Sequence, residues 1–221
     1  MNRILLIPLI AAPLGIASQE AHAASGFHPS KAAGVAQKMA EALSAQTRIQ
    51  VRGTTVGPGA LKTSYLMRYQ SAAKESLSQM GGPWSQVRVG DKGMAGVRSV
   101  TIGHKVFTSM DGRHWFRSSR GDMPRPLDAL SLNVANAPCC VPANRSASVK
   151  VTDGGTTRWR GGRVDRLGFT CVAEGYLVTG TVLIDPRSYL PLQYTQKTAM
   201  PKMRGSFVLS YGGTFSISEP H

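Results

Sequence analysis

Side chains that could perform catalysis are few and scattered along this chain. The sequence contains neither Gly-x-Ser-x-Gly nor His-Glu-x-x-His, the patterns that position a nucleophilic serine or two zinc-binding histidines. Asp111 and Asp185 stand in turn sequences, where an aspartate caps backbone N–H groups. The histidines beyond the N-terminal segment have no metal-ligand spacing: His28, His104, His114 and His221. These residues therefore predict structural roles, and we expect no catalysis, metal or cofactor.

A basic stretch surrounds Trp159. It contains Arg158, Arg160, Arg163 and Arg166. The indole and the guanidinium groups could together contact anionic lipid headgroups at a membrane surface. Strand alternation alone would also place Arg158 and Arg160 in solvent whenever Trp159 points inward. The sequence leaves both interpretations open.

Aromatic and methionine side chains gather on the expected strands. Flexible Met and large aromatic surfaces suit an apolar cavity that holds acyl chains. A helix could instead fill the same space and make an ordinary core. The candidate cavity residues are Tyr65, Met67, Tyr69, Trp84, Phe107, Trp115 and Phe116.

The chain has three cysteines, two of them adjacent. Neighbouring cysteines rarely bond to each other because the small ring distorts the peptide between them. We therefore expect Cys171 to pair with Cys139 or Cys140. On the chain-entropy model such a bridge, closing a loop of about 30 residues, contributes roughly 3 kcal/mol.

The elements that position these residues follow from hydrophobic periodicity. Residues 30–45 predict an amphipathic helix, with Ser30 as N-cap and Val35, Met39 and Leu43 four residues apart. From residue 47 the period becomes two. Residues 47–56 and 61–70 then predict strands that are apolar on one face and basic or polar on the other.

A hairpin is expected at Asp111-Gly112, because glycine tolerates the positive φ of a type I′ turn. Closure by these two residues places Phe107 opposite Phe116 and Thr108 opposite Trp115. Each face of the hairpin then carries an aromatic ring, which indicates apolar material on both sides.

The remaining pattern adds one short helix at 126–137 and many strands. Strands that follow one another with turns and few helices predict a mainly β, α+β domain: a curved antiparallel sheet forming an open half-barrel, with helices over its concave face. Further strands are expected at 84–89, 97–102, 105–110, 148–152, 156–160, 166–173, 176–184, 190–197, 205–211 and 215–218.

The N-terminal segment has the pattern of an export signal. Arg3 precedes an apolar run at 4–16, and Ala21-His22-Ala23 offers small residues for a cleavage after Ala23. The run is shorter than the roughly 20 apolar residues of a membrane-spanning helix. We therefore expect residues 1–23 to be removed and residues 24–221 to form one soluble periplasmic domain.

The net charge is +14, from 26 Lys and Arg against 12 Asp and Glu. Such a balance favours transient contact with anionic membranes or acidic polymers, or simply maintains solubility. Nucleic acid is not an expected partner of an exported chain.

The order of elements resembles the outer-membrane lipoprotein carriers and their lipid-binding relatives, the LolA-like superfamily. An export signal, one helix and a continuous antiparallel sheet lead to a central hairpin at 111–115 (Asp-Gly-Arg-His-Trp). A strand and turn at 182–186 (Val-Leu-Ile-Asp-Pro) precede Leu-Pro-Leu at 190–192, and a Tyr-Gly strand ends at 211–212.

The resemblance implies an unclosed β-barrel with a hydrophobic cavity for a lipid or the acyl groups of lipoproteins, and no catalysis. The main interpretation is a periplasmic carrier. Two alternatives stay open: an envelope sensor that binds a membrane-anchored partner through the same fold, and a secreted enzyme with a polar cluster in the cavity.

Overall fold

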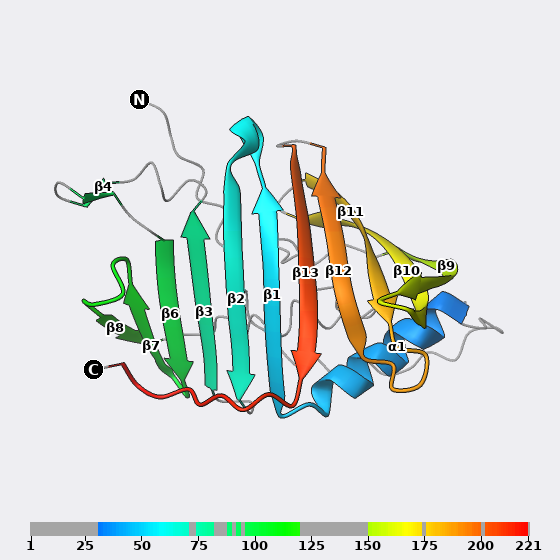
Figure 1. Ribbon diagram of the computed structural model, residues 1–221, viewed down its shortest axis with the longest axis horizontal. Helices are drawn as coiled ribbons and strands as arrows, with labels where there is room; N and C mark the ends of the chain where they lie inside the picture. The colour runs from blue at the N-terminus through cyan, green and yellow to red at the C-terminus, as the bar shows by residue number, and fades with distance from the viewer. Residues whose placement is uncertain are drawn as a thin grey trace, which may run out of the picture.

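The computed structural model describes residues 31–70, 74–81, 88–89, 92–93, 96–119, 150–173, 176–199 and 202–220. Within these residues, eleven strands form one antiparallel sheet in the order β8-β7-β6-β3-β2-β1-β13-β12-β11-β10-β9 (Figure 1). Two short strands, β4 (Arg88–Val89) and β5 (Lys92–Gly93), pair separately. The sheet strands are β1 (Arg48–Val56), β2 (Lys62–Gln70), β3 (Lys74–Gly81), β6 (Gly96–Ile102), β7 (Lys105–Ser109), β8 (Phe116–Ser119), β9 (Lys150–Trp159), β10 (Gly162–Ala173), β11 (Tyr176–Ile184), β12 (Pro191–Thr198) and β13 (Met203–Tyr211).

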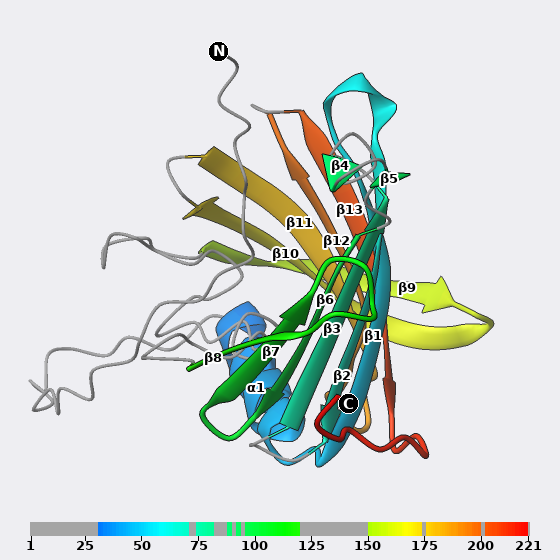
Figure 2. The same cartoon turned by 90° about the vertical axis from the view of Figure 1, so that its left-hand side faces the viewer.

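The sheet is curved and open, as the sequence predicts. In the described part of the chain, β8 and β9 end the sheet and do not pair with each other. Figure 2 shows the strands bending around helix α1 (Lys31–Ser44), which lies on the concave side. The opposite, convex side faces the viewer in Figure 1.

Helix α1 buries one stripe of small and apolar side chains. Ala36, Met39 and Leu43 are at most 1% exposed, and Ala32 is 3% exposed. Met39 and Leu43 are buried as predicted, whereas Val35 is only partly buried and Ala36 takes its place in the stripe. The four residues lie on a single helical face. They pack in one cluster with Ile49, Val51, Val182, Ile184 and Tyr194 from the sheet, among others.

The predicted alternation of β1 and β2 is confirmed. Ile49 and Val51 are fully buried, and Met67 and Tyr69 are nearly so. Val51 pairs with Met67, and Ile49 with Tyr69, so the four side chains share the concave face.

The predicted closure of the β7–β8 hairpin is wrong by one residue. Thr108 lies opposite Phe116, and Phe107 opposite Arg117. The loop is longer than two residues because polar side chains organise it. Asp111 Oδ1 accepts hydrogen bonds from the backbone N–H of Arg113 and of His114, each at 2.8 Å, and Ser109 Oγ accepts from Gly112 N–H.

Other expectations differ from the observed elements. Strand β3 was not anticipated, because its sequence is mostly polar. The two strands expected at 148–152 and 156–160 are one strand, β9, with an irregular register against β10. The helix expected at 126–137 and Trp84 lie outside the described residues.

The segment after β13 is not the expected strand at 215–218 but an extended tail. Figure 1 shows it running along the lower ends of β1, β2, β3 and β6. Ile217 is buried, and its N–H donates to Gln70 Oε1 at 2.8 Å. The Arg68 guanidinium lies over the Phe215 ring, and Lys105 pairs with Glu219 at 2.7 Å. The tail therefore ties β13 to β2 and β7 across the convex side.

Substituting Met39 tests how strongly α1 holds the concave face. Met39→Ala removes a fully buried side chain, and we expect a loss of about 3 kcal/mol in the free energy of unfolding. Chemical denaturation measures it. Gln37→Ala, on the exposed face of the same helix, is the control. Equal midpoints for the two variants would contradict the packing described here.

Cys171 is 1% exposed and belongs to the core cluster. Its expected partners, Cys139 and Cys140, lie outside the described residues, so the pairing stays a prediction. Peptide mapping under non-reducing conditions should link Cys171 to the peptide that contains both. Cys139→Ser and Cys140→Ser variants then identify the partner, and a map with Cys171 unlinked would refute the bridge.

Candidate functional site

A row of side chains crosses the concave face from the core to the sheet edge. The register aligns Leu209, Val51, Met67, Leu77, Ser99, Thr108 and Phe116 on seven neighbouring strands. The first three are at most 4% exposed, Leu77 is half-buried and Phe116 is 70% exposed. The concave face is therefore tightly packed beside α1 and opens toward β8.

Three of the predicted cavity residues come together on this face. Tyr65, Met67 and Tyr69 alternate along β2 and all point to the concave side. The Tyr65 ring packs 5.7 Å from the Phe207 ring, and Thr55 Oγ1 donates to the Tyr65 hydroxyl at 3.2 Å. The Phe207 ring fills the space above Gly53, where a Cβ atom would lie 2.1 Å from it.

The other predicted cavity residues are not part of this group. Phe107 pairs with Val100 and lies on the convex side, where it is 8% exposed. Phe116 is on the concave face but at the sheet edge, and Trp115 is half-buried in the loop before it. Trp84 lies outside the described residues.

One concave residue that the sequence did not suggest is a carboxyl group. Glu75 is 5% exposed and lies directly opposite Tyr69. It stands in the polar strand β3, whose composition gave no sign of a buried face. The Glu75 carboxyl and the Tyr69 phenol are therefore two buried polar groups on a mainly apolar part of the concave face.

The predicted arginine group sits on the β9–β10 hairpin, which projects from the sheet in Figure 2. Arg158 lies opposite Arg163, and all four arginines are exposed. Arg160 has φ +48° in the turn, and its guanidinium lies 4.4 Å from the centre of the Trp159 ring. Arg166 instead turns to the Gly154 carbonyl, to which its Nε and Nη2 donate at 3.1 and 2.9 Å.

A second feature missed by the sequence is a basic groove of about 750 Å³ on the convex side. Its walls include Thr54, Thr181, Thr195, Lys197 and Arg204. Lys197 and Arg204 are direct cross-strand partners, and no ion pair of theirs occurs among the described residues. Like charges placed opposite each other repel, so this surface favours anions. Only the strand register reveals the pair, because the two residues are seven positions apart in sequence.

Three further observations concern metal ligands, membrane-spanning helices and the ionisation of one tyrosine. Among the described residues, no cluster of three or more His, Cys, Asp or Glu side chains could hold a metal ion. The described part of the chain contains no helix long and apolar enough to cross a membrane. Burial raises the pKa of Tyr211, whose hydroxyl donates to the Pro191 carbonyl.

These features define a half-barrel: one curved antiparallel sheet, a helix on its concave side and a concave face that is apolar beside the helix and becomes exposed at one edge. The sequence predicts an open half-barrel of this kind, and the described residues confirm it.

Several proteins of known structure are similar to this chain. The chain is similar to the lipoprotein LppX of Mycobacterium tuberculosis, at 12% identity over 84% of this chain and 97% of that one, with a TM-score of 0.50. It is also similar to LprF of Mycobacterium bovis, at 12% identity over 88% and 99%, with a TM-score of 0.51. A LolA superfamily protein of Nitrosomonas europaea matches at 11% identity over 81% and 91%, with a TM-score of 0.29. No protein-family model and no curated protein sequence matches. At these identities the likeness establishes the fold alone.

Asp111 organises the loop that precedes Phe116, and this can be tested. Hydrogen bonds from the His114 backbone, the His114 ring and the Arg113 backbone lower the pKa of Asp111 below 3.8. The folded pKa is depressed, so the carboxylate holds the loop at all pH values above 3.8 and releases it only as the pH falls through the lower folded value. Asp111→Ala should therefore speed amide hydrogen exchange at Arg113 and His114 at pH 7.

The matched control is the other aspartate turn. Asp185 Oδ1 accepts from the backbone N–H of Arg187 and Ser188, and Asp111→Ala should leave their exchange unchanged. Unaltered exchange at His114 would show that Asp111 does not organise the hairpin loop.

Proposed function

We propose that this protein is an exported carrier or binding protein that holds a lipid or an acyl chain on the concave side of its half-barrel, without catalysis. Residues 1–23 direct export to the periplasm in this proposal, and residues 24–221 form the binding domain. The single observation that carries it is the concave row, which is apolar from Leu209 in the packed core to Leu77. The row then passes Ser99 and Thr108 and ends at the open edge with the exposed ring of Phe116.

The chemistry of this face suits an acyl chain. Met67 and Leu77 present flexible, nonpolar surface, and the Tyr65–Phe207 pair adds aromatic area. Burying ten methylenes contributes up to about 8 kcal/mol before ordering costs, so an apolar surface alone can hold such a ligand. Glu75 and Tyr69 would lie beside the chain and offer polar contacts to a headgroup or an ester.

The charged surfaces fit a ligand that comes from a membrane. Arg158, Arg160 and Arg163 are exposed at one hairpin tip, and Lys197 and Arg204 face each other on the convex side. Anionic headgroups are attracted to such surfaces within a Debye length. Two proteins whose solved structures are similar to this chain are the lipoprotein LppX and LprF.

Uptake of a fluorescent fatty acid by purified, delipidated protein tests the proposal. Leu77→Gln places an amide on the concave face and should weaken uptake about tenfold, because the amide loses its water without gaining a partner. Leu66→Gln is the matched control, since Leu66 is on the neighbouring strand but on the convex face.

Mass spectrometry of organic extracts from the undelipidated protein should identify the natural ligand. Absence of any lipid together with no uptake would refute the carrier. Co-purification of a membrane protein without lipid would favour the envelope-sensor alternative. Equal fatty-acid uptake by Leu77→Gln and Leu66→Gln would show that the ligand does not bind on the concave row.

A further inference from the structure

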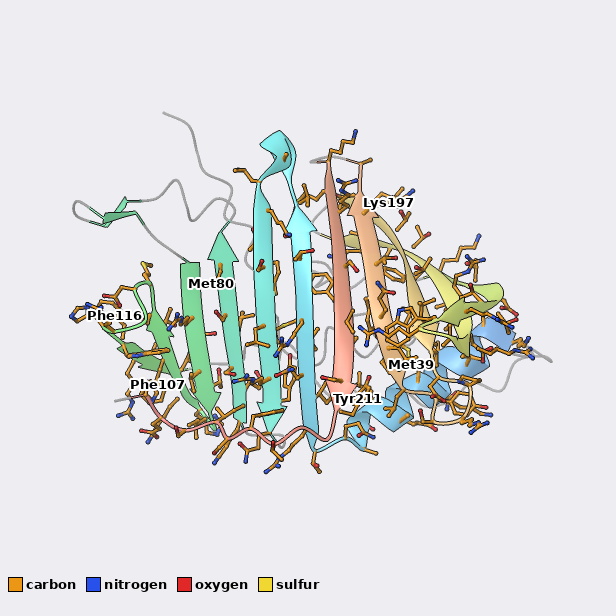
Figure 3. All side chains as sticks on the ribbon, in the orientation of Figure 1. Met39, Met80, Phe107, Phe116, Lys197 and Tyr211 are labelled. Atoms are coloured by element: carbon orange, nitrogen blue, oxygen red, sulfur yellow. The ribbon has the colours of Figure 1, made fainter. Side chains whose placement is uncertain are left out.

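The β7–β8 hairpin concentrates exposed apolar side chains. Among the described residues, three large apolar side chains are strongly exposed: Phe116 at 70%, Leu177 at 53% and Met110 at 46%. Phe116 and Met110 flank the loop of this one hairpin, with the half-buried Trp115 between them. Figure 3 shows Phe116 at the edge of the molecule farthest from Met39 and α1. Clustered exposure of this kind marks an interaction site.

Cations surround these apolar groups. Arg113 and Arg117 are exposed beside Phe116, and the Arg98 guanidinium lies against Gly112 in the loop. Asp111, the acidic residue of the loop, is already engaged by Ser109, by two backbone N–H groups and by the His114 ring at 2.5 Å. The hairpin therefore presents two arginines, the neighbouring strand β6 adds Arg98, and the carboxylate of the loop already has its partners.

The same hairpin borders a groove of about 590 Å³. The rings of Phe107, Trp115 and Phe116 line it together with Arg113, Arg117 and Pro220. Phe116 is also the last member of the concave row. Aromatic rings, a methionine and arginines on one protruding loop are the composition of surfaces that sit at the boundary between headgroups and acyl chains.

We propose that the β7–β8 hairpin docks the protein on an anionic lipid bilayer, with Phe116 and Met110 entering the acyl region and Arg98, Arg113 and Arg117 contacting headgroup phosphates. A bilayer fits better than an acidic protein because Phe116 and Met110 gain from leaving water while the guanidinium groups stay at the polar surface. Docking here brings the open end of the concave row to the membrane.

The inference that lipid enters or leaves the concave row at the membrane rests on the proposed function. Docking itself does not, because membrane binding can be measured without any ligand. The β9–β10 hairpin is the competing basic surface. It differs because Arg160 covers the Trp159 ring and no strongly exposed apolar side chain lies in it among the described residues.

Co-sedimentation with vesicles of 30% phosphatidylglycerol in phosphatidylcholine tests the docking. The full chain should bind these vesicles and lose most binding on pure phosphatidylcholine or at high salt. Phe116→Ser should weaken binding about tenfold, whereas Leu177→Ser, which alters the exposed apolar residue outside the hairpin, should not. Arg113→Gln with Arg117→Gln should weaken it more than tenfold, at about fivefold for each lost charge.

Arg158→Gln with Arg163→Gln is the charge-matched control and should retain most of the binding. Equal losses in the two arginine pairs, equal losses for Phe116→Ser and Leu177→Ser, or binding of an acidic protein in place of vesicles would overturn the proposal. Fatty-acid uptake from vesicle-free solution separates the two hypotheses. The Arg113→Gln with Arg117→Gln variant, which leaves the concave row intact, should keep this uptake. Absence of uptake in the wild type would contradict the carrier function while leaving the docking result intact.

Discussion

A single curved sheet with an apolar concave face is stable only when something covers that face, and the stripe of α1 supplies this cover. Each large apolar side chain buried there contributes about 1.5–3 kcal/mol. Met39 and Leu43 are the largest members of the stripe, and they belong to one core cluster with side chains from β1, β2 and β10 to β13. The exposure of the concave row rises beyond β2: Met67 is 4% exposed, Leu77 is half-buried and Phe116 is 70% exposed.

Features with a strong local cause could be predicted from the sequence. The period of α1, the alternation of β1 and β2 and the Asp185 turn depend on neighbouring residues, and all appear as expected. Strand β3 could not be found in this way, because its place in the sheet depends on pairing with β2 and β6 and not on its own polar sequence. The hairpin register failed for a different reason: Ser109 and Asp111 capture backbone donors and lengthen the loop.

The residue types of the candidate site could be predicted from the sequence, but the positions of several of its side chains could not. Alternation put Tyr65, Met67 and Tyr69 on one face correctly. Aromatic identity alone could not say that Phe107 points away from them, since the face of a residue follows from a register that passes through three intervening pairings. The Lys197–Arg204 pair and the carboxyl of Glu75 are likewise consequences of cross-strand pairing.

The sheet order also divides the chain into two meanders that meet at one line. Most strands pair with a neighbour in sequence, but β1 pairs with β13, at nearly the opposite end of the described chain. Forming that ladder requires closing a long loop, which costs entropy before any contact is gained. Each meander can form from local hairpins, and we expect the β1–β13 seam to join them late. The core cluster contains α1 together with strands of both meanders, so we expect the docking of α1 and the closing of the seam to occur together.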